Sequence, residues 1–408
     1  VGNVIQGAFG LSLDNRPEAD FPDATGDGIQ IPGVELKIVP LTRRSNRWRV
    51  KERQVIGMIN YNDLPDETWP SSHARMKMNR ILNVFVTHES QGNRSASIVK
   101  GASLWQPDSF IDPIFEDDWT ICQKMVAEGR AHELSERLFR TLSACRKGSG
   151  GKADIVRYRH GIEPALRRAF SFKVSYMNGI WEQHRTNKKS LITFNDSNPL
   201  KSVLDRLRII EGRTMSEVVD EIGIPLPKAK DYAYRILRHW ITGGKGGRRI
   251  AELDDLGILL KTVPIRDSDL RPWEATSFPA ISIDDLIQCE TFEDHFMAEE
   301  LSSILFVPTM RQKRRSHWGN IRFGSPILWE PSNEEWTIIK QEWTMFRDVL
   351  RTPLGANRLP KASDTRILHM RPKARDGRVR DVGPWGEITK QCFWLNQGFV
   401  QSLLCQNR

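Results

Sequence analysis

Short apolar runs rich in β-branched residues alternate with longer amphipathic stretches along this chain. The short runs have the length and composition of strands, and we predict strands at residues 34–39, 81–86, 258–263 and 304–307. Helical periodicity predicts helices at residues 117–128, 133–142, 202–211 and 333–351, and two or three short helices within 214–240. The mixture indicates an α/β fold of the mixed α+β kind.

The chain contains the same pattern twice. PGVELKIVPL at residues 32–41 corresponds to LGILLKTVPI at 256–265, an offset of 224. DDWTICQKMV around Trp119 and QEWTMFRDVL around Trp343 are also 224 apart, and AFSFKVSYMNGIW corresponds to CFWLNQGFVQSLL at an offset of 223. LNVFVTHES and SILFVPTM form a fourth pair in the same order. We therefore predict a duplicated domain.

A turn-rich segment, NDSNPL at residues 195–200, is the predicted boundary between domains 1–198 and 199–408. The GGKGG segment at 243–247 is interpreted as a flexible basic loop, because no Lys-Ser or Lys-Thr pair follows it as in a phosphate loop. The chain starts at Val1 inside a helical pattern, so we expect sequence upstream of it.

Charge and composition narrow the class of protein. The chain has 60 Lys and Arg against 51 Asp and Glu, a net charge of +9 that suits an anionic partner such as nucleic acid. No apolar run approaches the ~20 residues of a membrane span, and no signal peptide opens the chain. The 5 cysteines are widely spaced and never form a C-x-x-C pair, which argues against a zinc site and for a reducing, cytoplasmic setting.

The segment GVELK at residues 33–37 joins a carboxylate and an amine on one predicted strand. Side chains alternate between the faces of a strand, so Glu35 and Lys37 point to one side and Leu36 to the other. Hydrolysis of a phosphodiester requires a metal ion, an activated water and a cation near the phosphate. Mg²⁺ is commonly held by one or two carboxylates, so a second carboxylate should complete the site.

Two upstream acids are candidates for that second carboxylate. Asp20 in DFPDA precedes a proline turn, and Asp27 lies in the turn sequence TGDG. In the second copy Glu252 follows Gly243 by nine residues, much as Asp20 follows Gly10 by ten. This register favours Asp20 over Asp27.

The second copy lacks the carboxylate on its strand. Leu259 stands where Glu35 stands, whereas Lys261 matches Lys37. Because leucine cannot bind Mg²⁺, we expect the second copy to be inactive as a nuclease and to keep its basic residues available for DNA.

These segments resemble the MutH family, particularly its two-domain relatives, the Sau-type restriction endonucleases that cut at GATC. The first half carries the resemblance in VIQGAFG, DFP, GVELKIVPL, SSHARMKMNRIL and EDDWTICQKMVAEGRAHELSERL. The second half carries it in RTMSEVVDEIGIPLP, LGILLKTVPI, RFGSPILWEPSNEEW, QEWTMFRDVL and HMRPKA. It implies two tandem restriction-endonuclease-like domains of the PD-(D/E)xK, MutH type, each a central mixed sheet flanked by helices. Domain 1–198 would be catalytic and domain 199–408 a degenerate DNA-binding effector.

The resemblance assigns roles at the candidate site. Asp20, Glu35 and the backbone carbonyl of Leu36 would hold Mg²⁺, and Lys37 would orient the attacking water. Lys77 in HARMK would contact the phosphate or stabilise the leaving charge.

Two further residues take their interpretation from the resemblance. Gln6 stands in place of the family's helix glutamate and brings no charge, which argues against a second metal site. We interpret His73 as structural.

The resemblance also indicates a base-reading loop after a late strand. The matching residues are Arg146 and Lys147 in the first half and Arg371, Pro372 and Lys373 in the second half. Arginine commonly reads O6 and N7 of guanine in the major groove. The first half has no Arg-Pro pair at this point, so the resemblance constrains the recognised sequence less than the chemistry.

The leading hypothesis is a Mg²⁺-dependent type II restriction endonuclease that cuts double-stranded DNA at GATC or a close variant. Its second domain would bind another copy of the site as an activator, the type IIE arrangement. The alternatives are a repair nickase of the MutH kind and a sequence-specific DNA-binding protein without catalysis. The expected partner is double-stranded DNA, at two sites at once, and the chain could be a monomer when free and a dimer on DNA.

Overall fold

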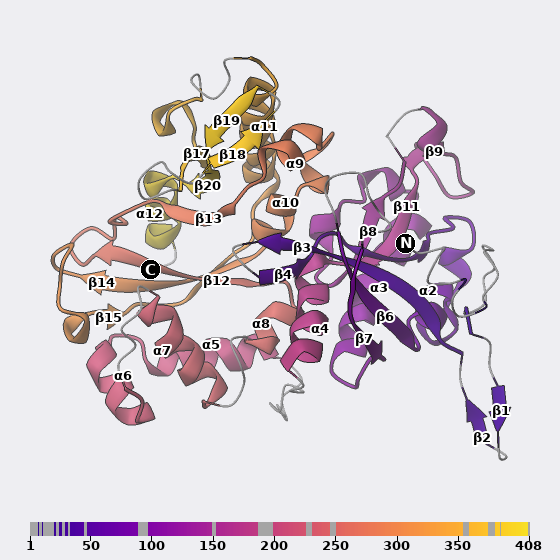
Figure 1. The fold of residues 1–408 in the computed structure, drawn as a ribbon, viewed down its shortest axis with the longest axis horizontal. Helices are drawn as coiled ribbons and strands as arrows, with labels where there is room; N and C mark the ends of the chain where they lie inside the picture. Colours follow the sequence, from indigo (N-terminus) through magenta and orange to yellow (C-terminus); the bar gives the residue numbers. More distant parts are fainter. Residues whose placement is uncertain are drawn as a thin grey trace. The chain divides into compact units, whose positions relative to one another are not determined.

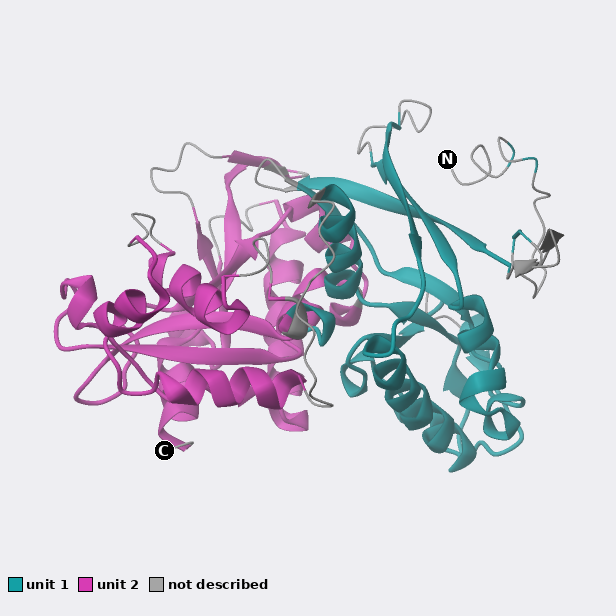
Figure 2. Cartoon of the chain, turned by 90° about the horizontal axis from the view of Figure 1, so that it is seen from below, with its two compact units in different colours: residues 1–191, 254–257 teal, residues 192–253, 258–408 magenta. Residues whose placement is uncertain are grey.

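The structure is a computed structural model that describes residues 7, 10, 20–21, 24–26, 29–31, 33–44, 47–88, 97–148, 152–186, 199–225, 231–244, 250–353, 359–373, 380–383 and 385–406. The chain divides into two compact units (Figure 2). Unit 1 comprises residues 1–191 and 254–257, and unit 2 comprises residues 192–253 and 258–408. Each unit combines helices with sheets, so the predicted mixed α/β fold is confirmed (Figure 1).

The helices and strands of unit 1 are β1 (Ala24–Gly26), β2 (Ile29–Ile31), β3 (Glu35–Arg44), β4 (Arg47–Val50), β5 (Gln54–Met58), α2 (His73–Lys77), β6 (Ile81–Thr87), β7 (Val99–Trp105), α3 (Ile111–Ala127), β8 (Leu142–Arg146), β9 (Ile155–Val156), β10 (Ala165–Leu166), β11 (Arg168–Phe172) and α4 (Val174–Thr186). A mixed sheet has the strand order β4-β3-β6-β7, in which β3 and β6 run parallel. An antiparallel sheet has the order β5-β11-β8. Strands β1 and β2 form an antiparallel hairpin.

The helices and strands of unit 2 are α5 (Pro199–Ile209), α6 (Met215–Ile222), α7 (Tyr232–Thr242), α8 (Ala251–Asp255, whose end belongs to unit 1), β12 (Leu259–Arg266), β13 (Thr276–Ala280), α9 (Ile283–Gln288), α10 (Phe296–Glu300), β14 (Ile304–Arg311), β15 (Arg322–Phe323), β16 (Ile327–Trp329), α11 (Asn333–Leu350), β17 (Leu368–Pro372), β18 (Arg380–Gly383), β19 (Gly386–Thr389), β20 (Gln391–Leu395) and α12 (Gln397–Gln406). A mixed sheet joins β12, β14 and β15, with β16 also paired to β14. An antiparallel sheet has the order β13-β20-β17.

The two units repeat one set of strand pairings. The parallel pair β3 and β6 matches Glu35 with Ile81, and the parallel pair β12 and β14 matches Leu259 with Ile304. These partners differ by 259 − 35 = 224 and 304 − 81 = 223, the offsets found in the sequence. The antiparallel sheets correspond in the same way, since the central strand is β11 in one and β20 in the other. The internal repeat therefore extends from the sequence to the strand pairing.

Each unit also uses a buried carboxylate to hold the first residues of an edge strand. Asp118 in α3 is 1% exposed and accepts the backbone N–H groups of residues 140, 141 and 142 at 2.7 to 2.8 Å. Glu342 in α11 accepts the N–H groups of residues 366, 367 and 368 in unit 2. Burial raises the pKa of Asp118 and of Glu342, and the N–H donors oppose that rise. The long helix of each unit is thereby tied to β8 or β17.

The predicted helix at residues 133–142 is wrong. The structure has 3-10 turns at Ala131–Glu133 and Glu136–Leu138, and β8 begins directly afterwards. Asp118 takes the N–H groups that would have continued a helix, and the Arg168 guanidinium binds the carbonyls of Leu134 and Ala144. Tertiary contacts override the local propensity here.

Other predicted elements are confirmed with shifted ends. The helix predicted at 117–128 begins earlier, because Ile111 and Phe115 extend the buried stripe of α3. The short helices predicted within 214–240 are confirmed as α6 and α7, and Gly223 ends α6 in a left-handed conformation at φ 65°. Among the described residues, no helix has the length and apolarity needed to cross a bilayer.

We expect Asp118→Asn to lower the free energy of unfolding by about 2 kcal/mol, because an amide NH₂ cannot replace a carboxylate oxygen facing buried N–H groups. Urea denaturation would measure the change. Asp117→Asn is the matched control, since Asp117 lies exposed on the same helix. Equal stability of the two variants would contradict the role given to Asp118.

Candidate active site

A carboxylate is buried at the start of β3. Glu35 is 4% exposed and shares its strand face with Lys37 and with the core residues Val39 and Leu41 further along. Leu36 points to the other face and packs in a separate small apolar cluster. A charge removed from water in this way is costly unless other groups compensate it.

Two lysines provide that compensation. Lys37 Nζ lies 2.7 Å from Oε1 of Glu35, and Lys77 Nζ lies 3.3 Å from the same oxygen. Lys77 is the last residue of α2, which leads into β6, the parallel neighbour of β3. The Ser72 side chain caps this short helix by accepting the Arg75 N–H at 3.1 Å. The parallel pairing therefore brings an amine from 42 residues downstream to the Glu35 carboxylate.

Asp20 reaches the same point from the amino-terminal side. Phe21 and Val34 form an isolated antiparallel bridge with N–H···O distances of 3.0 and 2.9 Å. Continuing this register by one residue sets Asp20 opposite Glu35, and Asp20 Oδ2 accepts the Leu36 N–H at 2.7 Å. The structure thus brings together Asp20, Glu35, Lys37 and Lys77, four of the residues predicted from the sequence.

The second carboxylate oxygen of Glu35 differs from the first in its contacts. Oε2 is buried and has no hydrogen-bond partner among the described residues. No group of three or more His, Cys, Asp or Glu side chains that could hold a metal was found in the described part of the chain. Two carboxylates, one with a bare buried oxygen, are a donor set that fits Mg²⁺, because this ion keeps several waters and binds few protein oxygens.

Three further predictions concern Gln6, Asp27 and the backbone carbonyl of Leu36. Gln6 and Asp27 lie outside the described residues. Leu36 contributes its N–H to Asp20, and the use of its carbonyl as a metal ligand stays a prediction.

His73, at the start of α2, lies beside this cluster and lines a cavity of about 280 Å³ with Glu67 and Asn60. Gly57 of β5 leaves room for it, because a Cβ atom there would lie 3.1 Å from Cε1 of His73 and 3.7 Å from Cδ of Lys77. Burial lowers the pKa of His73, the Lys77 ammonium acts in the same direction, and the Glu35 carboxylate acts against both. His73 therefore senses the charges of the site.

The predicted base-reading residues lie on the antiparallel sheets. In unit 1, Arg146 ends β8 opposite Arg168 of β11, and the Lys147 N–H donates to the Arg167 carbonyl. These contacts do not link Arg146 or Lys147 to the Glu35 cluster, and their role in DNA binding stays a prediction.

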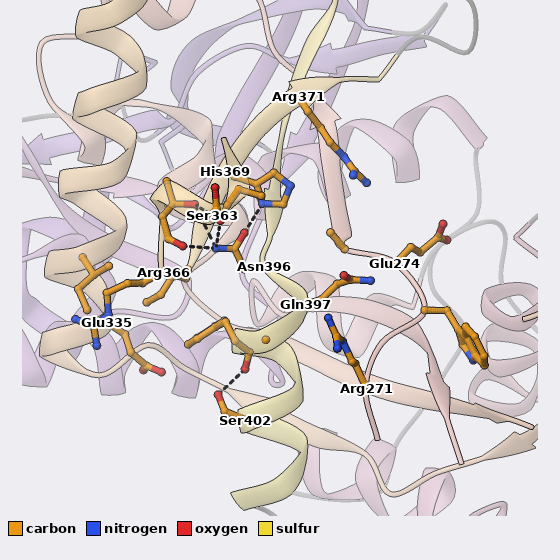
Figure 3. Close-up of a pocket in the computed structure, with 18 of the residues that line it drawn as sticks. Arg271, Glu274, Glu335, Ser363, Arg366, His369, Arg371, Asn396, Gln397 and Ser402 are labelled. Carbon is orange, nitrogen blue, oxygen red and sulfur yellow. Dashed lines mark hydrogen bonds between the residues drawn. The ribbon is translucent and has the colours of Figure 1, made fainter. Parts of the chain in front are cut away.

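In unit 2, Arg371 lines a groove of about 1040 Å³ (Figure 3). Its guanidinium lies 3.8 Å from the ring centroid of Trp394 in β20. Figure 3 shows Arg271, Glu274 and Gln397 around the same part of the groove. Pro372 ends β17 and is exposed, whereas the Lys373 amine bonds to the carbonyl of Phe278.

Trp394 was absent from the sequence prediction. Strand alternation sets Trp394 on the face opposite Phe393, which is fully buried. This alternation could have identified Trp394 from the sequence as a residue on the outer face of the strand.

Comparison with known proteins agrees with the geometry. Residues 9–118 and 245–342 match the family described as DNA mismatch repair enzyme MutH. The chain belongs to the MutH family. The first matched segment contains Asp20, Glu35, Lys37 and Lys77, and the second contains Leu259 and Lys261.

Individual relatives cover either the whole chain or half of it. The type II restriction enzyme Sau3AI of Staphylococcus aureus is 27% identical over 97% of this chain and 86% of its own length. The mismatch repair protein MutH of Shewanella woodyi is 28% identical over 50% of this chain and 90% of its own length. MutH of Shewanella baltica is 27% identical over 50% of this chain and 94% of its own length. The resemblance inferred from the motifs is confirmed.

The coupling of His73 to its neighbours can be measured directly. We expect Glu35→Gln to lower the pKa of His73 further, because it removes the carboxylate that raises it. Lys77→Met should raise this pKa, because it removes a like charge. NMR titration of the His73 imidazole would give both values, and shifts of the same sign would contradict the described arrangement.

Proposed function

We propose that this chain is a DNA endonuclease of the MutH and Sau3AI type, and specifically a Mg²⁺-dependent type II restriction enzyme. Unit 1 hydrolyses double-stranded DNA at GATC or a close variant, and unit 2 binds a second DNA site as an activator. The observation that carries the proposal is the buried Glu35 carboxylate. Two lysines contact one of its oxygens, the other oxygen has no hydrogen-bond partner among the described residues, and Asp20 binds the N–H of the next residue, Leu36.

Asp20 and Glu35 are the residues that would hold Mg²⁺. When bound there, Mg²⁺ supplies charge compensation for the phosphate and lowers the pKa of a coordinated water. The Leu36 N–H fixes the Asp20 carboxylate, so one of its oxygens is already directed by the backbone.

The two lysines have separate tasks. Lys37 lies on the face of β3 that carries Glu35 and is 23% exposed, so its amine can hydrogen-bond both the carboxylate and the attacking water. Lys77 approaches from α2 and would neutralise charge on the phosphate or on the leaving oxygen. Lysine amines donate strong hydrogen bonds to anionic oxygens, which suits both tasks.

The duplication restricts how both strands are cut. Leu259 replaces the glutamate in unit 2, so each chain offers one such carboxylate and lysine cluster among its described residues. Cleavage of both strands then requires two chains on the DNA or two successive cuts by one chain. The similarity of half of the chain to mismatch repair MutH proteins favours a nickase as the second candidate function.

Glu35→Gln should reduce DNA cutting by more than about 100-fold, as expected when a charge-stabilising group leaves a catalytic centre. DNA binding in a gel-shift assay should persist, since Gln keeps the shape of the side chain. Glu52→Gln is the matched control, because Glu52 is exposed on the turn between β4 and β5 and should cut normally. Full cutting by Glu35→Gln would refute the assignment.

Digestion of a supercoiled plasmid separates the candidate functions. With Mg²⁺ we expect discrete double-strand fragments whose ends map to GATC, and with EDTA we expect intact plasmid. Nicked circles alone would support the nickase, and DNA binding without any cutting would support a non-catalytic binding protein.

A further inference from the structure

Unit 2 keeps the strand register of the candidate active site but carries different charges. Leu259 replaces Glu35 at the start of the parallel pair. Lys77 stands four residues before β6, and Glu300 stands four residues before β14. At the start of the parallel pair, unit 2 therefore has a leucine in place of the carboxylate of unit 1. Four residues before the second strand of the pair, it has a carboxylate in place of the amine.

Lys261, the counterpart of Lys37, has a new partner. Its amine donates to the Ser277 carbonyl at 2.8 Å and lies 4.7 Å from the ring centroid of Phe278. Because Lys261 belongs to β12 and Ser277 to β13, this bond joins the mixed and antiparallel sheets of unit 2. Lys373 reaches the same strand through the Phe278 carbonyl. In unit 1 the corresponding amine of Lys37 contacts Glu35 instead.

We propose that Lys261 supplies from within unit 2 the cation that unit 1 takes up from solution, so that unit 2 binds double-stranded DNA without a divalent metal ion. This inference rests on the proposed function, because it requires unit 2 to bind DNA.

The charges around the two sites support this difference. In unit 1, Asp20 and Glu35 balance Lys37 and Lys77, and a buried carboxylate oxygen faces the site without a partner. A DNA phosphate approaching these carboxylates meets repulsion until a cation binds.

Unit 2 presents the opposite situation. Among the described side chains, Glu300 and Lys373 are the ionic groups that act on Lys261, and no buried carboxylate oxygen in the described part of unit 2 lacks a partner. Burial lowers the pKa of Lys261, the Glu300 carboxylate acts against burial, and the Lys373 ammonium acts with it.

The hydrogen bond from Lys261 to Ser277, which joins the two sheets of unit 2, also affects DNA recognition. Arg371 lies in β17 of the antiparallel sheet and Lys373 follows that strand, and Lys261 fixes this sheet to the mixed sheet. A surface that is held in place before binding loses less conformational freedom when DNA docks. Unit 2 is therefore organised for DNA before any metal arrives, and the metal requirement is confined to cutting by unit 1.

Binding of a short labelled duplex containing GATC to the full chain carrying Glu35→Gln tests this inference. Fluorescence anisotropy is measured in EDTA and in Ca²⁺. We expect one duplex per chain in EDTA, with an affinity that Ca²⁺ changes less than about twofold. Arg371→Glu should abolish this binding, which assigns it to unit 2, and Lys124→Glu at an exposed position of α3 should preserve it.

Two variants test the role of Lys261. Lys261→Met should weaken binding in EDTA about tenfold, the effect of losing one hydrogen bond from a charged group. Leu259→Glu should draw the amine away from Ser277, as Glu35 does with Lys37, and make binding stronger in Ca²⁺ than in EDTA. A lysine with only a structural role would not create that divalent response. Lys340→Met, at an exposed pair with Glu293, is the matched control and should bind normally.

The outcomes separate the two proposals. Binding that requires Ca²⁺ in the parent chain overturns the inference, and so does unchanged binding by both Lys261→Met and Leu259→Glu. No binding in either EDTA or Ca²⁺ contradicts the proposed function itself.

Discussion

The burial of one carboxylate governs the arrangement of unit 1. Glu35 begins a strand whose same face becomes the hydrophobic core, so its charge lies where water cannot compensate it fully. Removing an ion from water costs several kcal/mol, and neighbouring charges must recover most of that cost. Lys37 and Lys77 do so through one oxygen, which leaves the other oxygen available to a cation. The proposed chemistry depends on this incomplete compensation.

The duplicated chain separates what maintains the fold from what performs the chemistry. Asp118 and Glu342 are buried carboxylates in equivalent helices, and each holds three backbone N–H groups. Their oxygens are satisfied by the protein, so they stabilise the fold in both units. Glu35 has no equivalent carboxylate in unit 2, where Leu259 needs no compensation and Lys261 turns to a carbonyl. The scaffold is retained in both copies, and the charges of the site differ.

The sequence pattern alone predicted part of the candidate active site. Strand alternation set Glu35 and Lys37 on one face, and the internal repeat identified Leu259 and Lys261 as their counterparts. The helix predicted at residues 133–142 failed because Asp118, distant in sequence, takes the N–H groups that a helix needs. Local propensity cannot include a hydrogen bond donated to a side chain from another element. The same limit hid the contact between Arg371 and Trp394, which depends on the pairing of β17 with β20.

The sequence by itself determined which residue types are present, their periodicity and their duplication, because these depend only on the order of residues along the chain. It therefore determined the mixed fold, the family and the asymmetry between the copies. The tertiary structure decided which charges meet. Parallel pairing of β3 and β6 sets Lys77 against Glu35, and the bridge between Phe21 and Val34 brings Asp20 to the Leu36 N–H. Electrostatic interactions depend on distance in space, and only the folded chain establishes that distance.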